Sequence, residues 1–139
     1  SREINLKEIP FLIEANRIDN ENLMREVAEK LSDHVRVTDS VKRQQIHIAA
    51  VFASNFSNHM YNVARDLAES NGVDFGILAS LIKETTAKAI ELGPQKAQTG
   101  PAKRNDEQVI EKHLEMLSAK PEIQELYKLI TQNIIDQNE

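Results

Sequence analysis

Residues 40–72 read SVKRQQIHIAAVFASNFSNHMYNVARDLAESNG, and this stretch decides the fold. Asp39 or Ser40 can cap a helix at its start, and Gly72 can supply the left-handed residue that ends one. No proline or glycine lies between these two ends. We therefore predict one helix of about 32 residues, which is about 48 Å long at 1.5 Å per residue. Such a helix is too long to lie at the periphery of a domain this small.

The composition agrees with a mainly helical protein. The chain has 139 residues, four of them Gly and four Pro, which implies long regular elements with few turns. Cysteine is absent, which excludes disulfides, thiolate metal sites and cysteine nucleophiles. The net charge is −5 and the basic residues are dispersed, so we expect no nucleic-acid partner. No apolar run reaches the ~20 residues of a membrane span, so we expect no membrane partner and a cytoplasmic location.

The N-terminal residues predict a strand, a helix and a second strand. The apolar run Ile9–Ala15 is short enough for a buried strand, and His34–Thr38 alternates in the manner of another. Between them Asp19-Asn20 can cap a helix that runs to about Ser32. Two parallel strands leave their edges uncovered. We therefore assign residues 1–39 to the terminal strand-helix-strand piece of a larger sheet.

The remaining residues, 40–139, predict an all-helical domain. After the long helix, a second is expected over Phe75–Leu92 and is stopped by Gly93-Pro94. Residues 95–104 form a loop, Asn105 caps a third helix that ends near Lys120, and Pro121 opens the last one. The fold class is thus mainly α, a long-helix bundle preceded by a short βαβ remnant.

The middle of the long helix carries polar side chains that a purely structural helix does not need. At about 100° per residue, His47, Ser54 and Asn58 fall within roughly 40° of one line, and Asn55 lies beside it. Small alanines around them let other backbones approach. These amides can satisfy one another in a multi-helix core, or they can face a ligand. Their number favours the ligand.

The sequence lacks the residue patterns that metal binding, serine nucleophiles and pyrophosphate binding require. His47 and His59 are twelve residues apart and point about 120° away from each other, so they cannot chelate a metal, and we predict no metal site. There is no Gly-x-Ser-x-Gly elbow. None of the four glycines follows a strand and opens a helix, as pyrophosphate binding requires. We therefore expect this chain by itself to bind no cofactor and to be inactive as an enzyme.

A second polar segment, Gln98-Thr99-Gly100-Pro101, lies in the predicted loop. It can be no more than a turn that stops a helix. Its place in a ten-residue loop between helices gives a functional role equal weight, because binding residues concentrate in such loops.

Three motifs together resemble a known family. They are HIAAVFASNFSNH over residues 47–59, QTGPAKRND over residues 98–106, and VIEKHL over residues 109–114. The pattern resembles the Rossmann-like/DUF2520 proteins across roughly residues 3–135. The resemblance implies a C-terminal helical domain similar to those of 6-phosphogluconate-dehydrogenase-like and pyrroline-5-carboxylate-reductase-like enzymes. It also implies that residues 1–39 end a Rossmann-type nucleotide-binding sheet and that the long helix leads into a dimerisation domain. The glycine-rich loop of the NADP-binding domain would then lie before Ser1.

One departure from these relatives concerns the proton donor. Several of them use a Lys four residues before an Asn on the long helix, but here Val51 precedes Asn55 and Ser54 precedes Asn58. His47 is the nearby titratable substitute, and an ordinary pKa near 6.5 suits it to general acid-base chemistry. We therefore predict His47 as the catalytic residue. The predicted substrate-binding residues are Ser54, Asn55, Asn58, Thr99, Gly100 and Pro101.

The leading hypothesis is the dimerisation and substrate-cleft domain of an NADP-dependent oxidoreductase that acts on an unknown small molecule. We expect a homodimer, since a long helix with small side chains gains most by packing against a copy. The chain begins Ser-Arg-Glu without Met, which leads us to expect a fragment. The alternatives are a stand-alone helical interaction module without catalysis and a regulatory small-molecule-binding domain.

Overall fold

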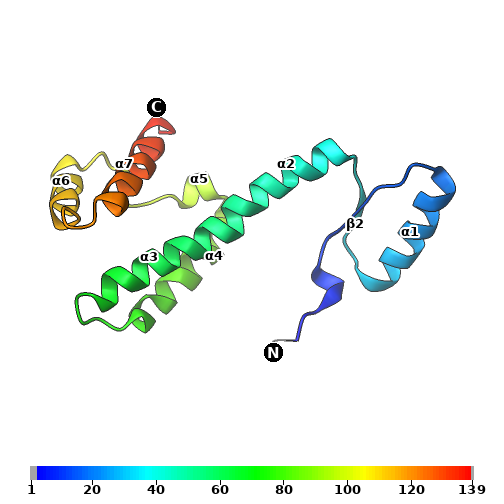
Figure 1. Ribbon diagram of the computed structural model, residues 1–139, viewed down its shortest axis with the longest axis horizontal. Helices are drawn as coiled ribbons and strands as arrows, with labels where there is room; N and C mark the ends of the chain where they lie inside the picture. The colour runs from blue at the N-terminus through cyan, green and yellow to red at the C-terminus, as the bar shows by residue number, and fades with distance from the viewer. Residues whose placement is uncertain (1–2, 139) are drawn as a thin grey trace. The chain divides into compact units, whose positions relative to one another are not determined.

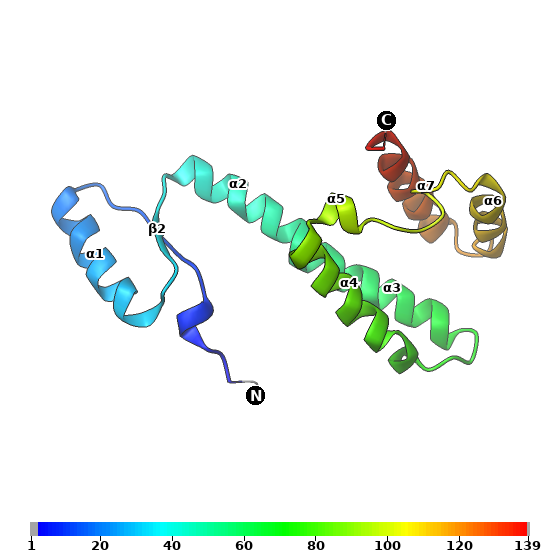
Figure 2. The same cartoon turned by 180° about the vertical axis from the view of Figure 1, so that it is seen from behind.

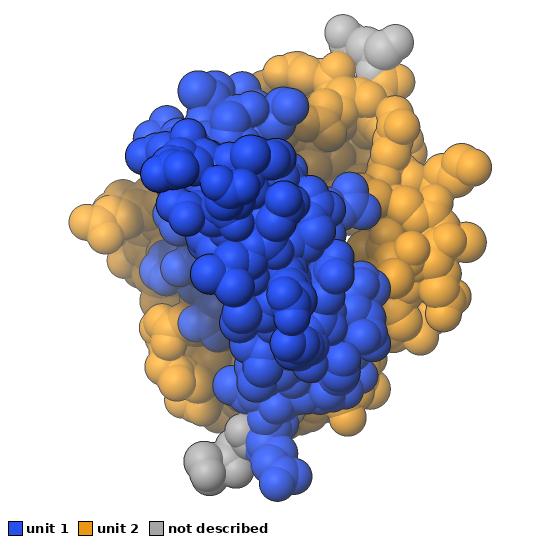
Figure 3. Space-filling view, turned by 90° about the vertical axis from the view of Figure 1, so that its right-hand side faces the viewer, with its two compact units in different colours: residues 1–60 blue, residues 61–139 orange. Residues whose placement is uncertain are grey.

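The computed structural model describes residues 3–138. They fall into two compact units, residues 1–60 and 61–139, coloured separately in Figure 3. Helices make up most of the chain, and a two-stranded parallel sheet lies near its N-terminus (Figure 1). The predicted fold class is confirmed. The predicted domain boundary at residue 39 stays a prediction, and the outermost ends of the predicted domains, residues 1, 2 and 139, lie outside the described part.

The first unit begins with the predicted strand, helix and strand. A 3-10 turn, η1 (Leu6–Glu8), leads into β1 (Phe11–Ile13), α1 (Ile18–Leu31) and β2 (Val35–Val37). β1 and β2 are parallel, with Phe11 opposite Val35 and Ile13 opposite Val37. Both strands are shorter than predicted. Pro10 cannot donate a backbone hydrogen bond, which confines it to the beginning of a strand.

The start of α1 corrects the sequence prediction. Arg17 is the N-cap residue and makes no capping hydrogen bond, whereas Asp19-Asn20 was the predicted cap. Asp19 and Glu21 lie instead in the first helical turn. Their negative charges are favourable there because the helix dipole is positive at its N-terminus.

A serine lies at the centre of this unit. Ser32 is only 1% exposed and is the buried polar residue among those described, and Ile13 and Ala28 of the same unit are buried as well. Its hydroxyl accepts a hydrogen bond from the His34 backbone N–H at 3.0 Å and donates to the Ile9 carbonyl oxygen. Ser32 therefore joins the segment before β1 to the segment before β2.

The long helix consists of three elements, α2 (Ser40–Ala50), η2 (Val51–Phe56) and α3 (Ser57–Glu69). The predicted cap is confirmed, because the Asp39 carboxylate accepts a hydrogen bond from the Lys42 backbone N–H at 2.8 Å. Gly72 has φ +72°, as predicted for the residue beyond a helix. The expectation of an uninterrupted α-helix is wrong at η2, which is π-helical.

The second unit is helical after Gly72. This part starts with a 3-10 turn, η3 (Phe75–Leu78). The helices that follow are labelled in Figure 2: α4 (Ala79–Leu92), α5 (Pro94–Ala97), α6 (Glu107–Met116) and α7 (Pro121–Asp136). Pro121 occupies the first turn of α7 as predicted. Two predictions are corrected. The short helix α5 occupies the start of the expected loop, and Asp106 rather than Asn105 caps α6.

A histidine and a tyrosine join α6 to α7. The His113 Nδ1 atom lies 2.9 Å from the Tyr127 hydroxyl, and the two rings meet edge to face. The Gln124 side chain also donates to the Leu114 carbonyl oxygen at 2.7 Å. The half-buried contact with Tyr127 makes His113 part of the α6–α7 packing.

Candidate functional site

The predicted site residues of the long helix all lie in the first unit. His47 is on α2, Ser54 and Asn55 are on η2, and Asn58 is on α3. All four side chains are exposed. Within this unit the amides do not fill a core, so their polar groups are free to meet a ligand or another surface.

The helix is wider around Ser54 and Asn55. Where η2 begins, the Val51 backbone N–H bonds to the carbonyl oxygens of both His47 and Ile48. Where it ends, the Ser57 hydroxyl donates to the Phe52 carbonyl oxygen at 3.2 Å. Hydrogen bonds that span five residues give less than 100° of rotation per residue, so positions calculated for an α-helix do not hold across η2. Single π turns inside α-helices are frequent at functional sites.

A carboxylate that the sequence reasoning missed holds the start of α2. Glu14, directly after β1, accepts hydrogen bonds from the Ser40 backbone N–H at 3.0 Å and from the Ser40 hydroxyl at 2.7 Å. Its other oxygen lies 2.8 Å from the Arg43 guanidinium. The signal was available in the sequence, because residues just after parallel strands gather at one edge of a sheet. Glu14 thereby connects the sheet to the helix that carries His47.

The Asp39 carboxylate shares this helix start. The hydrogen bond from the Lys42 backbone N–H holds the pKa of Asp39 below its ordinary value, and the positive charge of Lys42 acts in the same direction. The Asp39 side chain is exposed. Its ionised form is therefore the one that α2 stabilises.

The carboxylates at these helix starts affect whether the chain can bind the dinucleotide that the family resemblance implies. A helix N-terminus binds pyrophosphate through free N–H groups and a positive dipole. At α2 this position is occupied by Asp39 and Glu14, and the first turn of α1 carries Asp19 and Glu21. The starts of α1 and α2 therefore do not fit a pyrophosphate.

The segment Thr99-Gly100-Pro101 lies in the second unit. Gly100 has φ +102°, a conformation that favours glycine, and the Asp106 N–H bonds to the Pro101 carbonyl oxygen at 2.9 Å. Ala102 is buried beneath this turn, while Thr99 is exposed. The turn is thus firmly built. Its closure over the His47 segment stays a prediction, because the two segments belong to different units.

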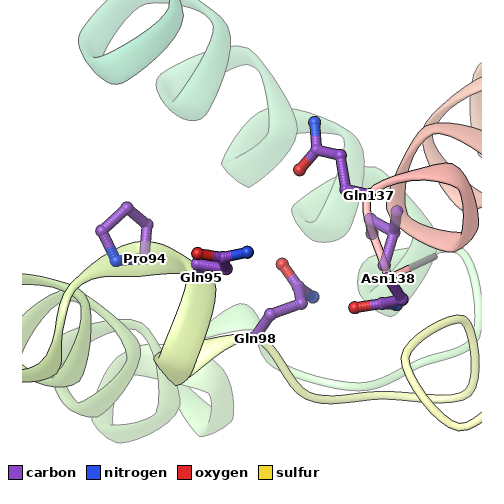
Figure 4. Close-up of a pocket in the computed structure, with 6 residues that line it drawn as sticks. Pro94, Gln95, Gln98, Gln137 and Asn138 are labelled. Carbon is purple, nitrogen blue, oxygen red and sulfur yellow. The ribbon is translucent and has the colours of Figure 1, made fainter.

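A pocket lies beside that turn. It has a volume of about 360 Å³ and is lined mainly by neutral amides (Figure 4): Pro94, Gln95, Gln98, Ile134, Gln137 and Asn138. The Gln98 side chain donates to the Thr99 carbonyl oxygen at 2.9 Å, and Lys103 contacts Asn138. The lining side chains other than Ile134 are exposed, and none of them is a nucleophile or carries charge. The pocket does not include Thr99, Gly100 or Pro101.

Across residues 3–138, no helix combines the length and apolar character of a membrane span. The same residues contain no group of three His, Cys, Asp or Glu side chains that could hold a metal ion.

Comparison with known families and structures gives a consistent result. The sequence profile of the domain of unknown function DUF2520 matches residues 9–134, which confirms the resemblance inferred from the motifs. A crystal structure from Bacteroides fragilis, provisionally named an NADP oxidoreductase, is 44% identical, with a TM-score of 0.93 over 97% of this chain. A protein from Thermotoga maritima is 25% identical, with a TM-score of 0.69 over 83% of this chain. A comparison with curated proteins found no match.

Both solved structures are longer than this chain. This chain covers 52% of the Bacteroides fragilis chain and 49% of the Thermotoga maritima chain. It therefore spans about half the length of the solved structures that it matches.

Proposed function

The chain belongs to the DUF2520 family, and on that premise we propose that it is the C-terminal, substrate-cleft and dimerisation part of an NADP-dependent oxidoreductase. The observation that carries this proposal is the close match to the Bacteroides fragilis structure, which extends over nearly the whole chain. The cofactor is bound by the other half of such a protein. The enzyme is cytoplasmic.

The polar segment of the long helix forms one wall of the substrate cleft. Its exposed imidazole and amides can donate hydrogen bonds to a carbonyl or carboxylate oxygen, which supports this role. His47 transfers the proton that accompanies hydride transfer to or from the substrate. The turn at Thr99 closes over the substrate, within one chain or across the dimer, and Thr99 adds a hydroxyl contact.

The alternative is a helical interaction module without catalysis. It is favoured by the large apolar side chains that remain exposed on the long helix, such as Ile48 and Phe52, each 65% exposed. Exposed apolar side chains in a row indicate a protein-protein contact. A dimerising enzyme domain also needs such a row, so only a measurement of catalysis separates the two.

The test uses the full-length protein and a panel of aldehydes, ketones and keto acids, with NADPH oxidation as the readout. With the substrate so found, His47→Ala is expected to lower kcat/KM at least about tenfold, which corresponds to roughly 1.4 kcal/mol. The melting temperature should change little, because His47 is exposed. His34→Ala is the matched control, since His34 is also exposed and lies outside the polar segment.

Two results would contradict the proposal. One is a full-length protein that oxidises NADPH with no member of the panel. The other is a His47→Ala variant that melts at a much lower temperature and keeps its turnover, which would assign His47 to the structure instead of the chemistry.

A further inference from the structure

Residues of similar type repeat every four positions along the middle of the long helix, whereas an α-helix has 3.6 residues per turn. An apolar row occurs at steps of four, Ile48, Phe52, Phe56 and Met60, and so does a second row, His47, Val51, Asn55 and His59. Each step of four drifts about 40° around an α-helix, so three steps drift about 120°. Both rows would therefore spiral away from their starting face.

The π-helical turn removes this drift. Hydrogen bonds that span five residues give roughly 80° of rotation per residue in place of 100°. The five steps between the six residues of η2 therefore lag behind an α-helix by roughly 100° in total. The two rows then run nearly straight along the helix. Within the apolar row, the Phe52 and Phe56 rings meet edge to face with centroids 4.9 Å apart.

The same rotation regroups the polar residues. His47, Asn55 and His59 come to within roughly 20° of one line, while Ser54 and Asn58 move roughly a quarter turn away from it. Asn55 and His59 are one turn apart, about 6 Å along the axis, and His47 is about 12 Å from Asn55. All three side chains are exposed.

We propose that Asn55 and His59 are the pair on this helix that holds a substrate carboxylate or carbonyl oxygen, with His47 on the same row and Asn58 off it. The inference rests on the proposed function and refines it, by replacing Asn58 with His59 among the residues that contact the substrate. The Asn55 amide and the His59 imidazole each supply an N–H donor to that oxygen. Two N–H donors side by side suit an anionic oxygen, so the ligand class is a small carboxylic acid or keto acid.

The wide turn is tested first, by NMR on the unmodified chain. The scalar coupling across hydrogen bonds identifies the carbonyl to which each amide binds. We expect the Phe56 amide to couple to the Val51 carbonyl, five residues earlier. Coupling to the Phe52 carbonyl, four residues earlier, would restore the ordinary α-helix and overturn the proposal.

The ligand pair is tested by titrating malonate, a small dicarboxylate, into the same chain at pH 6. The Asn55 side-chain amide and the His59 ring should shift together and saturate with one Kd, while the Asn58 amide stays in place. His59→Gln should weaken this binding at least fivefold, and Asn58→Ala should leave it within twofold. Saturable shifts on Asn58 without Asn55, or shifts that never saturate on any of these groups, would overturn the proposal.

These outcomes are separable from failure of the proposed function. If the full-length protein has no oxidoreductase activity but the coupling and the malonate shifts are as expected, the row is a ligand site of a different protein class. If the activity exists and the Phe56 amide couples to Phe52, the function stands and the assignment of Asn55 and His59 is wrong.

Discussion

At the scale of single residues, this chain is organised by polar side chains that make several hydrogen bonds each. Ser32 links two segments of the first unit, and Glu14 links β1 to the start of α2. Ser32 does not stand out in the sequence, since Ser is common on surfaces, and its role appears only once the strand, helix and strand are placed together. Glu14 could have been found from its position directly after β1.

Ser32→Ala should destabilise the chain by about 1–3 kcal/mol, because the His34 N–H and the Ile9 carbonyl oxygen would be left without their partner in a buried place. Urea denaturation followed by circular dichroism measures the change. Ser118→Ala, at an exposed position, is the control and should change stability by less than about 0.5 kcal/mol. Equal losses in the two variants would show that Ser32 does not have this linking role.

At the scale of elements, the sequence predicted what local rules control. The Asp39 cap, the left-handed Gly72 and the proline that opens α7 all follow from backbone and capping chemistry, and all are confirmed. The cap of α1 was wrong because the backbone enters that helix at Arg17, before the residues best suited to capping. The π-helical turn η2 was not predicted because each residue was assumed to rotate by 100° around the helix axis. The apolar residues of this helix repeat every four positions, a spacing that does not match 100° per residue.

The candidate site was predictable in part. Its residue types and the exposed segment could be identified from the motifs, but the direction in which each side chain points depends on the helix geometry at Ser54 and Asn55. The loop at Thr99 was located correctly, since Gly100-Pro101 specifies a turn. Which residues the loop meets depends on segments far from it in the sequence, and no local pattern encodes that.

The start of α2 gives a pH-dependent prediction. The folded-state pKa of Asp39 is lowered, so its contribution to stability is fully present above the ordinary Asp pKa. That contribution is lost as the pH falls below about 4, through the still lower folded-state value. Asp39→Asn keeps a capping oxygen but does not titrate.

Thermal melts of the two proteins between pH 2 and pH 7 measure this difference. The original chain should lose more stability than Asp39→Asn between pH 4 and pH 2, and the other carboxylates cancel in the comparison. Identical losses would mean that the Asp39 hydrogen bond contributes nothing to α2.

At the scale of the whole molecule, the described residues leave much apolar surface uncovered. The row Ile48, Phe52 and Phe56 is 65%, 65% and 48% exposed. A second copy of the helix can cover such a row, and closed two-fold pairing is the commonest arrangement. We therefore retain the homodimer as a proposal.

The homodimer predicts that the chain sediments at micromolar concentration as a species of twice 15.8 kDa. Phe52→Glu places a charge in the centre of the apolar row and should shift the population to monomer. Ile18→Glu changes an equally exposed residue on α1 and should leave the dimer intact. A single 15.8 kDa species for the original chain would contradict the dimer.

We propose that this chain supplies the substrate side of an NADP-dependent enzyme and not its cofactor site. Calorimetric titration of NADPH into the 139-residue chain and into the full-length protein tests it most directly. The acidic starts of α1 and α2 predict no measurable binding to the chain, whereas the full-length protein should bind with micromolar or tighter affinity. Micromolar binding of NADPH to the chain alone, or none to the full-length protein, would contradict the account.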